Sequence, residues 1–123
     1  MNTLLSAEQA EREGYCQKLL EREWPLEKAI HALKPGGSGH SPELWRSLVD
    51  AGWLGYPFSS DFGGADGSLI DVGLIYRAAG ERLVPHSYYS AMFAGLLVDA
   101  LGSVAQKRAL LASQIAGKAL MTV

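Results

Sequence analysis

Apolar side chains between residues 89 and 101 recur at the spacing of one helical face, and no other feature of the sequence limits the fold as strongly. They fall at i, i+3, i+4, i+7, i+8, i+11 and i+12, and they are Tyr89, Met92, Phe93, Leu96, Leu97, Ala100 and Leu101. A strand would instead need apolar residues at every second position. The repeat therefore predicts a long helix with a wide apolar stripe, which has to pack in the core of a domain.

Start and stop signals divide the rest of the chain into further helices. Four starts are marked by a serine that can cap a helix, and these serines are Ser6, Ser41, Ser68 and Ser103. Breaks are expected at glycines and prolines, namely at Pro25, at residues 34–40 (KPGGSGH), at Gly52, at Pro85 and at Gly102. We therefore predict an all-α fold, a bundle of about five to six helices in a single domain over residues 1–123.

Two segments are not expected to be helical. Residues 53–67 (WLGYPFSSDFGGADG) combine glycines with four aromatic residues, which favours an ordered loop packed on the helices over a flexible linker. Residues 119–123 (ALMTV) are apolar and end in β-branched residues, so they predict a short strand-like C-terminal tail. A single strand is unstable without a partner, and we therefore expect further chain after Val123.

Charge and composition argue against several classes of protein. The formal net charge is −2 and the eleven basic residues are scattered, so nucleic acid is not an expected partner. No apolar run approaches the roughly 18 residues of a membrane helix, and the N-terminus lacks a signal-peptide pattern. We therefore expect a cytoplasmic protein without membrane insertion. Cys16 is the single cysteine, which excludes a disulfide within the chain, and it is expected to be a small half-buried residue.

The sequence carries no motif for catalysis, metal binding or cofactor binding. The glycines of residues 63–67 match neither the phosphate-loop nor the dinucleotide-binding spacing, and tight turns explain them better. His31, His40 and His86 lack the spacing of metal ligands, and His40 is expected to face solvent from its glycine-rich loop. No pattern indicates a nucleophilic serine. We therefore assign no catalytic, metal-binding or cofactor-binding residue.

The start of the long helix is the best candidate for a ligand site. Residues 85–90 (PHSYYS) place two phenols, two hydroxyls and an imidazole ahead of an otherwise apolar helix. One interpretation is helix capping and aromatic packing. The other is that this end faces a ligand cavity, in which a few polar groups interrupt an apolar wall. On a helix, one side would be shared by His86, Tyr89, Ser90 and Phe93.

Five short pieces of the sequence follow one another in an order and at a spacing that are found together in one family. They are Gly-Tyr-Pro at 55–57, Phe-Gly-Gly at 62–64, Gly-Glu at 80–81, GSVAQK at 102–107 and the stretch 111–117, which closes on glycine. In this order they resemble the N-terminal domain of the acyl-CoA dehydrogenase family. The resemblance covers nearly the whole chain, from residue 4 to residue 123.

The resemblance implies a parent enzyme with an N-terminal helical, a middle β and a C-terminal helical domain. It implies FAD as the cofactor of the parent, not bound by this chain alone, and an acyl-CoA substrate that is converted to the 2,3-enoyl product. The partners would be the β and C-terminal domains or a partner subunit, in a homo- or hetero-oligomer. The N-terminal domain of the family supplies one wall of the acyl-chain cavity, which here implies substrate binding by His86, Tyr89, Ser90 and Phe93. The bulk of Tyr89 and Phe93 favours a short, branched or ring-bearing acyl group.

Two alternatives to a dehydrogenase remain open at this point. One is a relative on the same scaffold, such as a flavin monooxygenase, a nitroalkane oxidase or an inactive partner subunit. The other is a stand-alone helical interaction module. The module predicts a closed surface, whereas a dehydrogenase or its relatives predict an exposed apolar face where the β domain docks.

Overall fold

The computed structural model describes residues 5–122, with the exception of the side chain of His86. This part of the chain folds into six α-helices and two short 3₁₀ turns, and it contains no strand. The α-helices are α1 (Ala7–Glu23), α2 (Leu26–Leu33), α3 (Pro42–Asp50), α4 (Leu69–Glu81), α5 (His86–Leu101) and α6 (Val104–Ile115), and the 3₁₀ turns are η1 (Trp53–Gly55) and η2 (Ser60–Phe62). The all-α prediction is thereby confirmed, including the long helix that the apolar repeat indicated.

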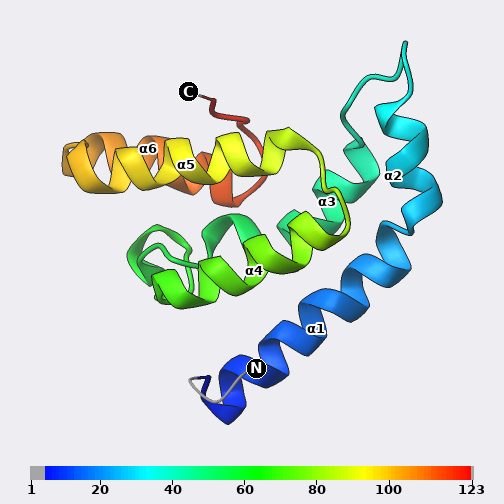
Figure 1. Ribbon diagram of the computed structural model, residues 1–123. Coiled ribbons are helices and arrows are strands. Elements are labelled where there is room, and N and C mark those ends of the chain that lie inside the picture. Colours follow the sequence, from blue (N-terminus) through cyan, green and yellow to red (C-terminus); the bar gives the residue numbers. More distant parts are fainter. Residues whose placement is uncertain (1–4, 123) are drawn as a thin grey trace.

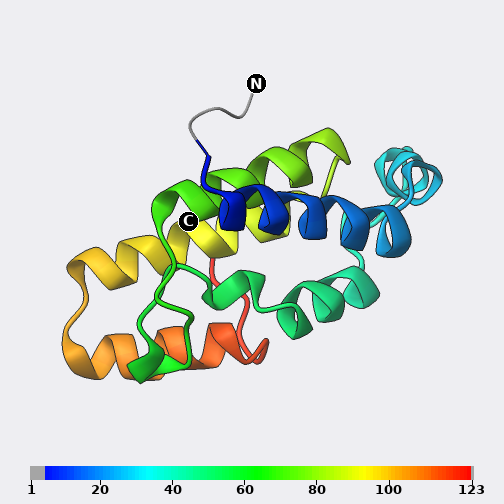
Figure 2. The same cartoon turned by 90° about the horizontal axis from the view of Figure 1, so that it is seen from below.

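Two pairs of helices form the body of the domain (Figure 1, Figure 2). α1 packs along α4, and α5 folds back on α6 as a hairpin. η1 contacts α3, α5 and α6, while α2 lies at the end of the molecule away from the α5–α6 turn. The largest buried side chains between these elements are Trp53, Tyr88, Phe58, Leu20 and Leu48.

Serine side chains start four of the helices, as predicted. The Oγ atoms of Ser6, Ser41, Ser68 and Ser103 each accept a hydrogen bond from the backbone N–H three residues later, at 3.1–3.2 Å. In α1, α4 and α6 the residue at that position completes a capping box. These bonds satisfy backbone donors that the first helical turn leaves free, so the helix starts follow from local sequence.

Residues 53–67 form an ordered loop, as their aromatic content predicted. Phe58 is completely buried in the core. The backbone N–H groups of residues 65–67 donate to carbonyl oxygens of residues 55–58, which closes the loop on itself. A Cβ atom at Gly64 would lie 2.1 Å from the carbonyl oxygen of Phe58, so this close approach of two backbones requires glycine.

The C-terminal tail differs from its prediction. Residues 119–122 have no regular secondary structure, and the described part of the chain holds no strand with which they could pair. A strand depends on hydrogen bonds to a neighbouring strand, so apolar and β-branched residues alone do not form one. Met121 packs against the helical core instead.

Ion pairs reinforce the packing of α1 on α4. Nη1 of Arg12 lies 2.6 Å from Oδ1 of Asp71, and Arg77 pairs with the buried carboxylate of Glu13. Asp71 is only 6% exposed and also accepts hydrogen bonds from the N–H and the hydroxyl of Ser68. Burial raises the pKa of Asp71, but the hydrogen bonds from Ser68 and the charge of Arg12 outweigh burial and hold this pKa below its ordinary value.

We expect Asp71→Asn to lower the free energy of unfolding at pH 7 by about 1–3 kcal/mol, because Arg12 loses its buried carboxylate while the side-chain shape is kept. A lowered folded-state pKa means that the ionised group stabilises the fold above its unfolded pKa. This contribution disappears as the pH falls through the folded-state pKa. Urea denaturation at pH 7 and about pH 2.5 should therefore show a smaller difference between wild type and variant at the lower pH. An equal difference at both pH values would contradict the assigned role of the charge.

α5 and α6 pack closely at Gly95. A Cβ atom at this position would lie 2.6 Å from Nε2 of Gln114 and 2.7 Å from Cζ of Phe58. Both of these side chains are completely buried, so neither has free space to move into. Glycine is unfavourable in a helix interior, and packing explains its presence in α5.

The variant Gly95→Ala should destabilise the domain by about 1–3 kcal/mol, because the added methyl group overpacks the contact between α5 and α6. Gly73→Ala is the matched control, since Gly73 is an exposed glycine inside α4 and nothing lies within 4 Å of an added Cβ. The control should stabilise the domain by up to about 1 kcal/mol through helix propensity alone. Opposite shifts of the midpoint in urea are the expected result, and stabilisation by both changes would show that α5 and α6 are not closely packed.

Candidate functional site

The predicted site residues lie on the first two turns of α5. Tyr89 is half-buried, and Phe93, one turn further on, is 53% exposed. Ser90 is only 7% exposed. His86 is the first residue of α5, and its side chain lies outside the described part of the structure. The helix thus brings Tyr89 and Phe93 to one accessible side and buries Ser90.

Tyr89 belongs to a cluster of four aromatic rings that the sequence did not reveal as a group. The ring centroids of Tyr89 and of Tyr76, which comes from α4, are 5.3 Å apart at an interplanar angle of 47°. The ring of Tyr88 packs edge-on against Trp53, Tyr76 and Tyr89, with centroid distances of 5.9, 5.8 and 5.7 Å. Tyr76 is recognisable in the sequence as part of an apolar helix face, but its contact with Tyr89 depends on how α4 and α5 meet.

Burial determines the charge state of the three phenols. It raises the pKa of Tyr76 and of Tyr89 above the ordinary value, and it raises the pKa of the fully buried Tyr88 well above that value. All three phenols are therefore neutral in the physiological pH range, and none is suited to be a general base. Trp53 and Tyr88 are buried in the core, so only Tyr76 and Tyr89 bring part of the cluster to the surface.

An apolar stripe continues from this cluster along α5 and over its turn into α6. We define the α5–α6 stripe by five exposed side chains, Phe93, Leu97, Leu101, Val104 and Leu110, of which Leu101 is 82% exposed. A shallow cavity of about 250 Å³ is lined by members of the stripe from both helices. Within the described range, no helix combines the length and the apolar character needed to cross a membrane. Several exposed apolar side chains on one pair of helices are typical of a surface that contacts another domain or chain.

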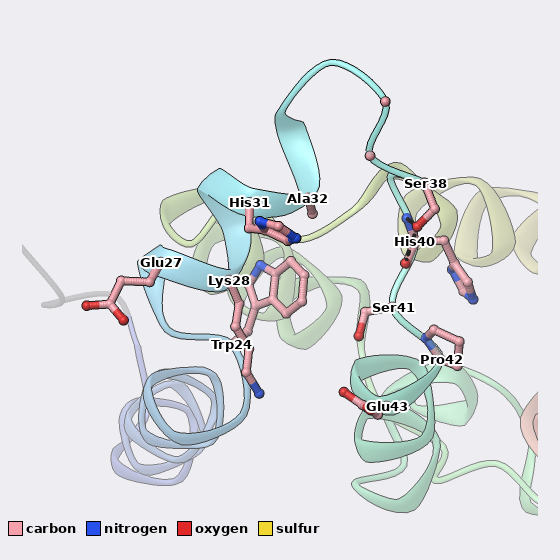
Figure 3. A pocket seen from close by; sticks show the side chains of 12 residues that line it. Trp24, Glu27, Lys28, His31, Ala32, Ser38, His40, Ser41, Pro42 and Glu43 are labelled. Carbon is pink, nitrogen blue, oxygen red and sulfur yellow. Dashed lines mark hydrogen bonds between the residues drawn. The ribbon is translucent and has the colours of Figure 1, made fainter.

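A larger cavity, which the sequence did not predict, lies between α2 and α3 (Figure 3). Its volume is about 650 Å³, and it is lined by α2, by the loop that follows α2 and by the start of α3. Trp24 forms part of its wall; the residue is 3% exposed, and its indole N–H has no hydrogen-bond partner among the described residues. His31 faces the cavity from α2 and Glu43 from α3 (Figure 3). Lys28 and Glu43 put both signs of charge on the lining.

His40 joins the glycine-rich loop to the start of α5. Its Nδ1 lies 3.3 Å from Oγ of Ser87, and its ring centroid lies 6.2 Å from the ring of Trp45. His40 is therefore half-buried, whereas its sequence context predicted a solvated side chain. The difference arises because the loop folds back toward α5, a contact that no local pattern indicates.

The glycine loop at residues 63–67 is not a phosphate site. Every backbone N–H of these five residues donates to a carbonyl oxygen of the same loop. A phosphate cradle needs such groups free to face the ligand, so the pyrophosphate of a flavin does not fit here. Within the part of the chain that the structure describes, no three His, Cys, Asp or Glu side chains are grouped so that they could hold a metal ion.

Cys16 is more deeply buried than its sequence context predicted. The thiol side chain is 2% exposed, and burial raises its pKa to about 11. A thiolate is the reactive form of cysteine, and both burial and the raised pKa suppress it. The single thiol of the chain therefore belongs to the core.

Comparison with known proteins gives the same family as the sequence motifs. The family described as "Acyl-CoA dehydrogenase, N-terminal domain" matches residues 6–118. The chain belongs to the acyl-CoA dehydrogenase family, of which it represents the N-terminal domain. Acyl-CoA dehydrogenase IpdE2 of Mycolicibacterium smegmatis is 29% identical over 76 residues, which cover 61% of this chain and 24% of that protein. The match thus spans about a quarter of the relative's length.

We expect Cys16 to react with a soluble thiol reagent at least about 100-fold more slowly in the native protein than in denaturant, because the thiol is buried and its pKa is raised to about 11. The rate of absorbance change with an aromatic disulfide at mildly alkaline pH measures this ratio. Rapid labelling of the native protein would show that α1 opens locally and that Cys16 is not a core residue.

Proposed function

We propose that this chain is the N-terminal helical domain of an FAD-dependent acyl-CoA dehydrogenase-like oxidoreductase, and that α5 supplies part of its acyl pocket. The family match over residues 6–118 carries the proposal. The reaction proposed for the complete enzyme is the α,β-dehydrogenation of an acyl-CoA thioester. Neither Tyr89 nor Ser90 is assigned a catalytic role, because the Tyr89 phenol is neutral and Ser90 is buried.

The proposed wall consists of His86, Tyr89, Ser90 and Phe93. Tyr89 and Phe93 would contact the acyl chain directly, since they are the accessible members on successive turns of α5. Ser90 would lie beneath them, since it is buried, and His86 is the first residue of the helix. Two large rings on successive turns leave less length for a straight chain, which supports a short, branched or ring-bearing acyl group as substrate.

The partners proposed for this domain are a β domain and a C-terminal helical domain, or a partner subunit that carries them. The α5–α6 stripe supports this proposal, because a domain that worked alone would have a closed surface. FAD would be held by those other parts, since the glycine loop of this chain has no free N–H group for it. A cytoplasmic homo- or hetero-oligomer is proposed for the complete enzyme.

The function is tested by producing the chain together with the remaining domains or the partner subunit and adding acyl-CoA thioesters without oxygen. Bleaching of the flavin absorbance together with formation of a 2,3-enoyl-CoA is the expected result. Bleaching by nitroalkanes alone, or substrate hydroxylation that needs oxygen, would favour a relative on the same scaffold. A stable flavin-free chain that binds neither partner nor thioester would favour an interaction module.

The variant Tyr89→Ala should raise kcat/KM for long straight-chain acyl-CoAs relative to short ones by about tenfold, because removal of the ring lengthens the proposed pocket. Tyr15→Ala is the matched control, since Tyr15 is an exposed tyrosine on α1, outside the proposed wall. The control should leave the chain-length profile unchanged. An unchanged profile in Tyr89→Ala would remove Tyr89 from the proposed wall.

A further inference from the structure

Tyr76 is a residue of α4 that contacts the proposed acyl wall. Its ring packs on that of Tyr89 at a centroid distance of 5.3 Å, and both residues are half-buried. Tyr76 and Tyr89 contact each other through their aromatic rings. The two residues are 13 positions apart in the sequence and come from consecutive helices.

The turn between α4 and α5 fixes this pairing. Leu83, two residues after the end of α4, has a φ of +54° in the left-handed region, and the N–H of Val84 donates to the carbonyl of Ala79 at 3.0 Å. This is the Schellman arrangement, which reverses the chain within a few residues. The turn therefore restricts movement of α5 along α4. The contact between Tyr76 and Tyr89 is restricted with it.

The buried side of the ring pair is fixed as well. Tyr88 is 1% exposed and packs edge-on against both Tyr76 and Tyr89, at 5.8 and 5.7 Å. With Tyr88 on one side and Tyr76 on another, the ring of Tyr89 cannot turn toward α4 unless Tyr76 moves. Paired rings of this kind stabilise each other beyond the area that they bury, which favours one side-chain conformer.

We infer that Tyr76 is a specificity-determining residue of the acyl pocket, because it holds the Tyr89 ring across the path of the acyl chain. This inference rests on the proposed function. The two phenols, tilted by 47° to each other, form one neutral surface, which suits a short, branched or ring-bearing acyl group and blocks a long straight chain. Tyr76 acts through Tyr89 and is a positioning residue, since its removal would let the Tyr89 ring rotate into the space beside α4.

The experiment compares Tyr76→Ala, Tyr76→Phe, Tyr89→Ala and the double variant Tyr76→Ala/Tyr89→Ala in the complete enzyme. The measured quantity is the ratio of kcat/KM for long and short straight-chain acyl-CoAs. Tyr76→Ala should raise this ratio by about tenfold, and the double variant should add little to Tyr89→Ala, because both act on one ring. Tyr76→Phe keeps the ring and should retain the wild-type ratio.

A structural readout separates positioning from loss of the fold. In the 123-residue chain, aromatic NMR signals of Tyr89 should become averaged in Tyr76→Ala, while amide signals of α1 and α6 stay in place. If Tyr76→Ala does not fold, Tyr76→Leu retains side-chain volume without the flat ring and should give the same changes.

The outcomes distinguish this inference from the proposed function. Wild-type enzyme that oxidises no acyl-CoA would overturn the proposed function and this inference with it. Wild-type activity with an unchanged ratio in a folded Tyr76→Ala or Tyr76→Leu variant would overturn this inference alone. A loss of the wild-type ratio in Tyr76→Phe would also overturn it, since the hydroxyl and not the ring would then be responsible.

Discussion

The buried ring of Tyr88 joins the parts of the molecule that surround the candidate site. It packs edge-on against Trp53 at the start of the 53–67 loop, against Tyr76 on α4 and against Tyr89 on its own helix. Edge-on pairs of rings prefer a limited range of distances and angles, so one fully buried ring constrains three elements at once. The accessible sides of Tyr76 and Tyr89 are consequently fixed by contacts that lie beneath the surface.

Electrostatic contacts hold the opposite side of α4. Asp71 and Arg77 of this helix pair with Arg12 and Glu13 of α1, and Asp71 also completes the cap of its own helix. Removal of one partner from a pair with a buried member leaves the other charge uncompensated, so these pairs favour the observed contact between α1 and α4. α4 is therefore fixed by charges toward α1 and by rings toward α5, and the candidate wall depends on both.

Local sequence determined more of the fold than of the site. Serine caps predicted the starts of α1, α3, α4 and α6, because a cap is made by residues three positions apart. Contacts between distant residues left no such signal. The pairing of Tyr76 with Tyr89 depends on the α4–α5 turn, and the contact of His40 with Ser87 depends on a loop that folds back over 47 positions. The cavity between α2 and α3 was missed for the same reason.

The apolar repeat of α5 was predicted as a core face, and the structure divides it between two environments. Met92 is completely buried, whereas Phe93, Leu97 and Leu101 remain exposed on the adjoining side. A stripe this wide cannot be covered by one neighbouring helix, and α6 covers only part of it.

Under the proposed function, aromatic side chains at the start of α5 would meet substrate, and aliphatic side chains at its end would meet another domain. Aliphatic groups need no hydrogen-bond partner when they are covered, whereas phenol hydroxyls are least costly where some polar contact remains. Under the same proposal, the order of residue types along α5 would therefore put the substrate contact directly beside the contact with another domain.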